Sequence, residues 1–563
     1  MRRRWCVTCQ TFDHVVYVRS DDVPALSPRV RSRIGAALAA VVLFFCSQEH
    51  AVAESGAKPN IVFILADDLG YGDIGAYKKK PSKIPTPHVD RIAREGVRFT
   101  DAHSPSSVCS PTRYALLTGR YAWRTRLRSG VVGIFGPPLI APDRLTVPSF
   151  LKGFGYTTAA IGKWHLGLTW PTVDGKPPIS RTDSTSNVDF TKPIGDAPTT
   201  RGFDYYFGVD LPNFPPYCFL ENDRTVGLPD RPDGGEAEGF NRPGPMLAGW
   251  KLVDILPEVT RRAVGYIERT AATKQPFFLY IPLTSPHYPV VPAPEFRGKT
   301  AVGDYGDFVY QTDWCVGQVL AALEKAGVAE DTLVIFTSDN GPEVSNEVRP
   351  GVYDRVKQYG HHSLDGLRGA KRDLWEAGHR VPFVARWPAK IPAGSVSDRT
   401  ICHVDLLATV AAVIGGKIPN NAGEDSVSFL SAMIGSGDVE PRLPLVHQGG
   451  SGHLAIRRGD WVLIAARSGQ ANSPALGEPE WLKKKRGYTD HDQPGELYNL
   501  RDDLIEARNL YAEKPELVAE MMQLLQKQVD DGRSTPGWPQ QNDVPVPIDP
   551  PRPARAKQQR AMK

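Results

Sequence analysis

Four short apolar runs in this chain each end in side chains that bind ions or transfer protons. Residues 60–66 precede Asp67 and Asp68, 157–161 precede Lys163 and His165, 277–283 precede His287, and 333–337 precede Asp339 and Asn340. Helical patterns with apolar residues at three-to-four spacing lie between them. This alternation predicts an α/β fold with a large, mainly parallel sheet flanked by helices. Because ligands bind beyond the carboxyl ends of such strands, we expect these side chains to meet at one edge.

The length of 563 residues leaves room for more than one domain. Residues 54–415 hold the strand and helix alternation and are predicted to form the main, catalytic domain. From about residue 415 the composition turns to Gly, Asn and Ser, and new strand patterns and a helix near 516–529 follow, so residues 416–544 are predicted to form a smaller α+β domain. Residues 545–563 are Pro-rich and basic, which predicts disorder.

The first 53 residues have the layout of a leader with a secretory signal peptide. Arg29, Arg31 and Arg33 precede an apolar run at 34–46, and Ala51-Val52-Ala53 supplies small residues for cleavage. The run is too short to span a bilayer comfortably, and no later stretch is long enough. We therefore expect export, to the periplasm or outside the cell, without stable membrane insertion. Lipid attachment at Cys46 and a start later than Met1 are alternatives.

The formal charge of +4 is unevenly distributed. The first 53 residues carry +3 and the last 13 carry +5, so the body between them carries −4. A nucleic-acid reader is expected to show a basic stripe, and we see none in the folded part. Four of the seven cysteines follow the leader, which is too few for a disulfide-built fold, and we expect one disulfide at most.

Residues 169–249 are rich in Pro, Gly, Asp and aromatic side chains, which predicts long loops over the site. Tyr205, Tyr206, Phe214 and Tyr217 there could stack on sugar rings or pack the loops onto the core. The pair at 361–362, both His, could reach a substrate or lie in a solvated loop.

One motif carries a family resemblance. Cys109-Ser110-Pro111-Thr112-Arg113 is followed by Leu116-Leu117-Thr118-Gly119, and the motif resembles the signature of the type I, arylsulfatase-like sulfatases of the alkaline-phosphatase-like superfamily. In that family a separate maturation enzyme oxidises the cysteine to formylglycine, whose hydrate attacks a sulfate ester. Ser110 as helix N-cap, with Pro111 in the first turn, would place Cys109 where an anion is stabilised.

The resemblance also implies a metal site. Asp67, Asp68, Asp339 and Asn340, together with position 109, match the family's metal ligands, and their hard oxygen donors suit Ca²⁺ or Mg²⁺. Calcium is preferred by resemblance, with Mg²⁺ as the alternative. The ion would polarise the sulfate.

Four further residues match active-site positions of the family, in the contexts GKWHLG, SPHYP and GAKRDLWEAG, besides Arg113 in the cysteine motif. The resemblance implies that Arg113 and Lys163 hold the hydrate and sulfate. It gives His165 the role of releasing sulfate and restoring the aldehyde. His287, paired with Lys371, would protonate the leaving oxygen.

The sequence therefore predicts an exported sulfatase that acts on sulfated carbohydrates, such as sulfated polysaccharide or glycosaminoglycan fragments. A phosphomonoester or phosphonate hydrolase of the same superfamily is one alternative. The other is a non-catalytic carbohydrate-binding protein, if Cys109 is never oxidised.

Overall fold

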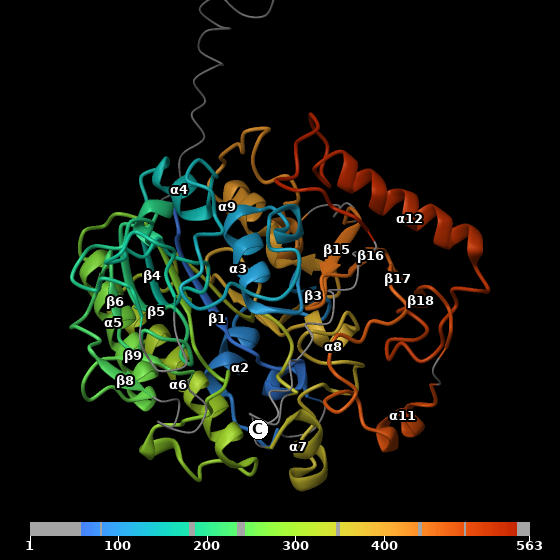
Figure 1. Cartoon of the computed structure of the whole chain (residues 1–563), viewed down its shortest axis with the longest axis horizontal. Helices are drawn as coiled ribbons and strands as arrows, with labels where there is room; N and C mark the ends of the chain where they lie inside the picture. The colour runs from blue at the N-terminus through green and yellow to red at the C-terminus, as the bar shows by residue number, and fades with distance from the viewer. Residues whose placement is uncertain are drawn as a thin grey trace, which may run out of the picture. The chain divides into compact units, whose positions relative to one another are not determined.

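The computed structural model describes residues 58–78, 82–179, 186–233, 242–344, 350–436, 442–488 and 491–548. The predicted signal peptide and residues 549–563 of the predicted tail lie outside this part of the chain. The described residues from Pro59 onward form one compact unit (Figure 1). In the described helices, none is both long enough and apolar enough to cross a membrane.

A large mixed sheet of ten strands forms the centre of this unit, as the sequence predicts. Its order is β13 (Ser395–Ser397), β2 (Val97–Phe99), β12 (Phe383–Arg386), β11 (Thr332–Ser338), β1 (Asn60–Ala66), β10 (Phe277–Pro282), β4 (Thr157–Lys163), β5 (Tyr205–Val209), β6 (Leu220–Glu221) and β7 (Arg224–Thr225). The five strands from β11 to β5 run parallel to one another. They are buried on both faces, which explains why they appear in the sequence as continuous apolar runs.

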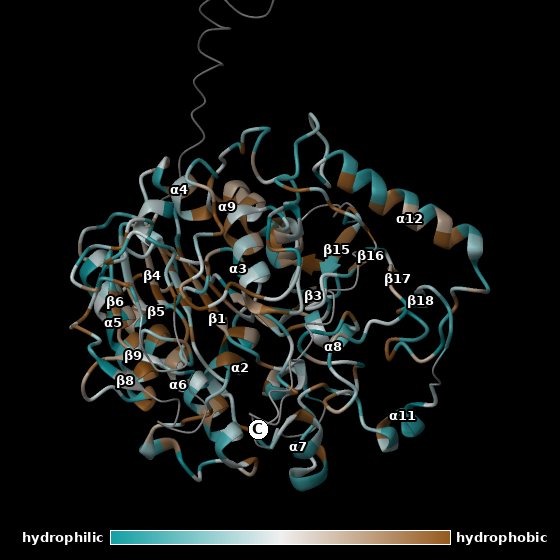
Figure 2. Ribbon diagram, in the orientation of Figure 1, coloured by the Kyte–Doolittle hydropathy of each residue, from teal (hydrophilic) through white to brown (hydrophobic). Residues whose placement is uncertain are grey.

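Helices cover the sheet, whose central strands are apolar (Figure 2), and strand β1 contributes side chains to two cores. Ile61, Phe63 and Leu65 face one core, and Val62 and Ile64 face the other, as the alternation of side chains along a strand requires. The first core includes α3 (Cys109–Thr118), α4 (Val147–Lys152), α9 (Leu406–Val413) and α10 (Leu430–Ile434). The second includes α2 (Pro87–Arg94), α5 (Ile255–Ala271) and α6 (Gly303–Lys325).

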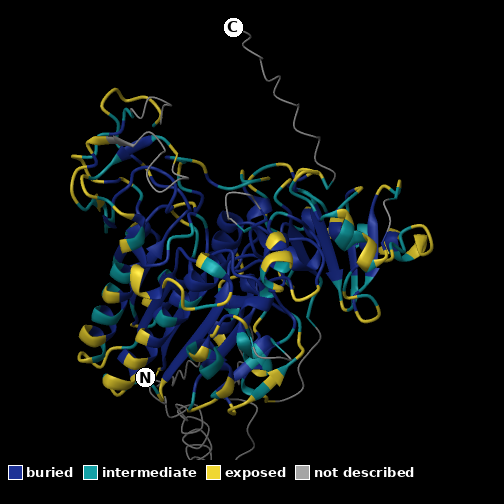
Figure 3. Ribbon diagram, turned by 90° about the horizontal axis from the view of Figure 1, so that it is seen from below, coloured by how far each residue is buried: buried dark blue, intermediate teal, exposed yellow. Residues whose placement is uncertain are grey.

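A smaller antiparallel sheet follows in the last part of the chain. It contains β15 (Leu445–Gln448), β16 (Leu454–Arg458), β17 (Trp461–Ile464) and β18 (Glu496–Asn499). One face packs with α12 (Pro515–Asp530) and with Tyr121 and Trp123 after α3; the other contacts Leu374 and Trp375. These surfaces are buried, and exposed residues gather on the outer helices and loops (Figure 3). Phe429 and Met433, which the sequence assigned to the smaller domain, pack in the core of the large sheet, so the boundary at 416 stays a prediction.

The remaining elements are short and lie in connections. They are β3 (Ala102–His103) paired with β14 (Ile401–Cys402), β8 (Arg231–Asp233) paired with β9 (Gly244–Met246), α7 (Val352–Tyr359), α8 (Glu376–His379) and α11 (Glu480–Arg486). The region predicted as long loops, 169–249, therefore contains strands, and β5 belongs to the main sheet. All four described cysteines are free.

Candidate active site

Four neighbouring strands deliver polar side chains to one edge of the sheet. Strand β1 lies between β11 and β10, and β4 follows β10. The chain beyond β1 is held by both neighbours, because the Asp67 amide donates to the carbonyl of Ser285 and the Asp339 amide donates to that of Ala66. The backbone N–H of Asp68 donates to Asp339 Oδ1 at 3.2 Å. Parallel register thus brings the ends of β1 and β11 into direct contact.

Helix α3 begins at Cys109 beneath this edge. Val108 is its N-cap and makes no side-chain hydrogen bond, so the expectation that Ser110 caps the helix is wrong. The Ser110 hydroxyl instead accepts the backbone N–H of Val132 at 3.1 Å. Position 109 still lies at a helix N-terminus, where free amides and the helix dipole favour an anion.

Asp67, Asp68, Cys109 and Asp339 each place one possible ligand atom within 4.8 Å of the others, and all four are buried. The Cys109 thiol lies 3.6 Å from Asp67 Oδ1. Asn340 donates from Nδ2 to Asp68 Oδ1 at 2.7 Å, but its buried Oδ1 has no partner in the described part of the chain. A buried amide oxygen without a hydrogen-bond partner destabilises the fold. The Asn340 Oδ1 atom is therefore suited to bind a hard cation.

Each of the three carboxylates is paired with a buried cation. Lys163 Nζ lies 2.6 Å from Asp67 Oδ2, and Lys371 Nζ lies 2.7 Å from Asp68 Oδ2. The Arg113 guanidinium lies 2.8 Å from Asp339 Oδ2 and also donates to the carbonyl of residue 163. Burial would lower the pKa of the Lys371 ammonium, but Asp68 holds it well above its ordinary value.

The two histidines carry their ring protons on different nitrogens. His165 donates from Nε2 to the carbonyl of Val132 at 3.1 Å, so its buried Nδ1, which has no partner within the described residues, carries a lone pair. His287 donates from Nδ1 to the carbonyl of Tyr288, so its Nε2 carries the lone pair and lies 3.8 Å from Asp68. Burial and Lys371 lower the pKa of His287 to about 3, and burial with Lys163 lowers that of His165 well below its usual range.

The backbone at this edge also departs from ordinary geometry. Asp68 and His165 have φ values of 64° and 55°, in the left-handed region that non-glycine residues rarely adopt. Such conformations persist where the surrounding contacts determine them, and they gather at functional sites.

Two acidic residues near the site, Glu343 and Asp210, were not predicted from the sequence. Glu343 is buried, lies 3.6 Å from Lys371 Nζ and binds the guanidinium of Arg372. Asp210 accepts the His165 amide at 3.0 Å, and burial raises its pKa to about 6. Glu343 follows three residues after Asn340, so an acidic side chain next to a predicted ligand was the available signal. Asp210 follows β5, which was not recognised as a strand.

The structure decides some of the alternatives left open for the aromatic residues of 169–249 and for His361 and His362. Tyr206 and Tyr217 are fully buried, as packing requires. The Phe214 ring lies 6.3 Å from the His165 ring, edge to face. His361 is buried against Asp73, with 2.7 Å between Nε2 and Oδ1, so the solvated-loop interpretation is wrong for this residue, whereas His362 is exposed.

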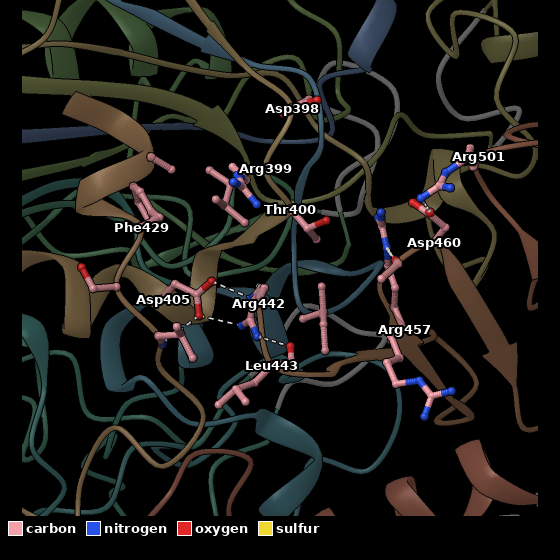
Figure 4. Close-up of a pocket in the computed structure, with 17 residues that line it drawn as sticks. Asp398, Arg399, Thr400, Asp405, Phe429, Arg442, Leu443, Arg457, Asp460 and Arg501 are labelled. Carbon is pink, nitrogen blue, oxygen red and sulfur yellow. Dashed lines mark hydrogen bonds and ion pairs between the residues drawn. The ribbon is translucent and has the colours of Figure 1, made fainter. Parts of the chain in front are cut away.

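Other polar clusters lie apart from this site. His103, His379 and His447 are close together, with the rings of His379 and His447 stacked at 3.8 Å and 12°. A cavity of about 600 Å³ beside the small sheet is lined by five arginines (Figure 4). Arg442 there is paired with Asp405 at 2.6 Å, and Arg457 with Asp101 at 2.7 Å.

Comparison with known proteins identifies the class. The sulfatase family model matches residues 59–416, and the chain belongs to the sulfatase family. It is 33% identical to an N-acetylgalactosamine-6-O-sulfatase of Bacteroides thetaiotaomicron, over 84% of this chain and 93% of that protein. It is 32% identical to human arylsulfatase A, over 84% of this chain and 88% of that protein. The chain is therefore a sulfuric ester hydrolase.

Solved structures agree. A structure described under the metabolism of multiple glycosaminoglycans by Bacteroides thetaiotaomicron matches with a TM-score of 0.71 and 32% identity, covering 84% of this chain and 99% of the other. A Pseudoalteromonas sulfatase matches with a TM-score of 0.65 and 23% identity, covering 86% and 93%, and supports the fold alone.

Proposed function

We propose that this sulfatase hydrolyses sulfate esters of carbohydrates, using formylglycine made from Cys109 and a bound divalent cation. The observation that carries the proposal is the buried cluster of three carboxylates around Cys109, with the unpartnered Asn340 Oδ1 beside it. Asp67, Asp68, Asp339 and Asn340 would hold the ion, with position 109 next to it. Their donors are all oxygens, which favours Ca²⁺, or Mg²⁺ as the alternative, over zinc.

The bound cation supplies Lewis acidity, which polarises the sulfate oxygens. Once oxidised and hydrated, residue 109 would supply the hydroxyl nucleophile, and the Cys109 thiol marks its place at the N-terminus of α3. Because the cysteine motif is the substrate of a separate maturation enzyme in this family, we propose such an enzyme as a partner.

The cationic side chains of the site would bind the sulfate and orient the carboxylates. Lys163 and Lys371 each hold a carboxylate and are close enough to the cluster to offer their remaining N–H groups to a sulfate. Arg113 lies behind the carboxylates and would fix Asp339 and Asp67, in addition to the contact with the hydrate implied by the family. Together these charges stabilise the charge that moves during S–O cleavage.

The histidines move protons. The lone pair on His165 Nδ1 makes this ring a base that can accept a hydroxyl proton when sulfate is released. His287 Nε2 lies 3.8 Å from Asp68, and a ring nitrogen of His287 lies within 4.8 Å of ligand atoms of Asp67 and Cys109. Its lowered pKa leaves it neutral near pH 7, so its role as the acid requires the negative charge of the bound sulfate to favour protonation.

The names of the relatives support a carbohydrate substrate, because one of them is an N-acetylgalactosamine-6-O-sulfatase. The predicted leader at 1–53 supports an exported enzyme that meets such polymers outside the cytoplasm. A phosphatase or a non-catalytic binding protein is not favoured by these relatives.

The proposal is tested by comparing kcat/KM for sulfated and phosphorylated forms of the same sugar and of nitrophenol. We expect the sulfate esters to be preferred and Cys109→Ala to lose turnover, with Cys315→Ala as the control because Cys315 packs on Thr260 in a distant helix. Preference for the phosphate esters, or full activity of Cys109→Ala, would contradict the proposal.

A further inference from the structure

Five lysines lie on segments that contact one another around Tyr359, His362 and Trp481, and we call them the lysine patch: Lys78, Lys83, Lys357, Lys484 and Lys485. Lys357 is on α7, Lys484 and Lys485 are on α11, and the other two lie in the connection between β1 and α2 (Figure 1). Lys78 Nζ donates to the carbonyl of His362 at 2.9 Å, and Lys83 donates to that of Tyr359. Burial, Lys78 and Lys485 lower the pKa of His362, which places both ammonium groups near one ring.

The patch is an excess of positive charge in an acidic body. Together with Asp354, Asp365 and the Glu480–Lys483 ion pair of α11, the five lysines leave +3, whereas residues 54–550 as a whole carry −4. Lys78 is paired with Asp365 at 2.9 Å. Lys484 and Lys485 are exposed and have no acidic partner in the described part of the chain. Unpaired like charges repel one another, so a patch of this kind is suited to a polyanion.

Two segments join the patch directly to the active site. One runs from Asp68 to Lys78, and the other runs from His362 to Lys371. They are held together by a hydrogen bond from the Gly72 amide to the carbonyl of residue 363 at 2.7 Å, and by the pair of His361 with Asp73. A Cβ on Gly72 would lie 2.1 Å from the carbonyl oxygen of residue 362, so the segments touch along their backbones. The patch is therefore fixed relative to the catalytic carboxylates.

An aromatic side chain lies within the patch. Between α7 and α11 there is a cavity of about 130 Å³, lined in part by Tyr353, Lys357 and Trp481. Lys357 Nζ lies 5.7 Å from the centre of the Trp481 ring. An apolar ring face next to an ammonium group matches a sugar ring that carries a sulfate.

We propose that the lysine patch binds further sulfated sugar units of a polysaccharide whose scissile sulfate occupies the active site. This rests on the proposed function and deepens it, because it assigns a polymeric, multiply sulfated substrate. The patch acts at the rim, so its charges strengthen capture of the chain and leave the chemical step unchanged.

The test measures binding and turnover separately. In a Cys109→Ala background, titration calorimetry would give the Kd of a sulfated hexasaccharide that contains N-acetylgalactosamine 6-sulfate, with and without Lys484→Glu and Lys485→Glu. We expect the double variant to raise this Kd by about tenfold at low salt, and the difference to shrink as salt screens the charges. The matched control is Lys274→Glu with Lys390→Glu, two exposed lysines at the opposite edge of the sheet.

In protein that retains Cys109 and has been matured to formylglycine, kcat for nitrophenyl sulfate should be the same in the double variant and the parent. The KM for the hexasaccharide should rise about tenfold in the double variant. An unchanged Kd in the double variant, or an equal rise of the Kd in the control pair, would overturn the proposal that the lysine patch binds the polysaccharide. Absence of sulfate release from both substrates in the parent would instead overturn the proposed function, and the Kd comparison would still decide the patch.

Discussion

At the scale of single residues, the contrast between His165 and His287 determines which proton transfers are available. Each ring donates one N–H to a backbone carbonyl, and the choice of nitrogen leaves opposite atoms free. His165 therefore offers Nδ1 and His287 offers Nε2. Backbone carbonyls cannot change protonation, so the assignment holds over a wide range of pH.

We predict that His287→Ala impairs esters with poor leaving groups far more than activated aryl sulfates. A general acid contributes typically about 10²–10⁴-fold where the leaving oxygen needs a proton, and little where it departs as an anion. The measurement is kcat/KM on a sugar sulfate and on nitrophenyl sulfate, with His88→Ala as a control. Equal losses on both substrates would remove the acid role from His287.

We also predict that chelation abolishes turnover and that Ca²⁺ restores it better than Zn²⁺. Oxygen ligands dominate the cluster, and the loss of the Asn340 oxygen should raise the calcium concentration for half-maximal stabilisation by about tenfold in Asn340→Ala. A calcium-dependent rise in Tm reports this without activity, because an ion that binds only the folded state stabilises it. Asn187→Ala, in an exposed loop, is the control. Full activity with no residual ion would contradict the prediction.

Much of the residue set could be predicted from sequence because each ligand follows an apolar run or lies in a motif. Asp67, Asp68, Asp339 and Asn340 come directly after β1 and β11, and these strands pair in register. Glu343 could not be assigned in this way, because its partners Lys371 and Arg372 are distant in sequence and only the fold brings them together.

At the scale of elements, the long parallel strands in the centre of the sheet were predictable from the sequence, and the short outer strands were not. Strands β2 and β13 contain three residues each, too few to show an apolar period. They form because β2 pairs with β12 on one side and with β13 on the other. The start of α3 was misassigned because Val108 lacks a capping side chain, so the sequence gives no signal at the true N-cap.

Helix α2 supplies a prediction about pH. Asp313 of α6 accepts the backbone amides of His88 and Val89 at the start of α2, at 3.1 and 2.8 Å. Burial raises the pKa of Asp313 to about 7. A folded-state pKa above the unfolded value of about 3.9 means that the folded state binds the proton more tightly, so this contribution to stability is present below pH 4 and is lost as pH rises through 7.

We therefore expect the Tm deficit of Asp313→Asn relative to the parent to be largest near pH 4.5 and to shrink by pH 8. The full linkage is at most about 4 kcal/mol for a shift of about three pKa units. Thermal unfolding of both proteins across this range measures the difference. A deficit that is constant with pH would contradict the assignment.

At the scale of the whole molecule, buried ion pairs connect the smaller sheet and its helix to the catalytic core. Arg124, after α3, lies 2.7 Å from Asp425 and donates to the carbonyl of Gln528 on α12 at 3.0 Å. Both charged groups of the Arg124–Asp425 pair are fully buried. Removal of one partner leaves an uncompensated buried charge.

We predict that Asp425→Ala lowers the free energy of unfolding by about 3–5 kcal/mol, whereas Glu520→Ala, which breaks an exposed pair with Arg458, lowers it by about 1 kcal/mol or less. Differential scanning calorimetry of both variants gives the comparison. Equal Tm values for the two variants would show that the buried pair does not tie the regions together.

The central claim is that turnover depends on oxidation of Cys109, and peptide mass spectrometry of this position tests it most directly. Protein made with and without a formylglycine-generating enzyme would be digested, and the peptide that contains residue 109 would be quantified as thiol or as aldehyde. We expect sulfate release per molecule to rise in proportion to the aldehyde fraction, and to vanish where the thiol is intact. Full sulfatase activity in a preparation whose residue 109 is entirely thiol would contradict the account.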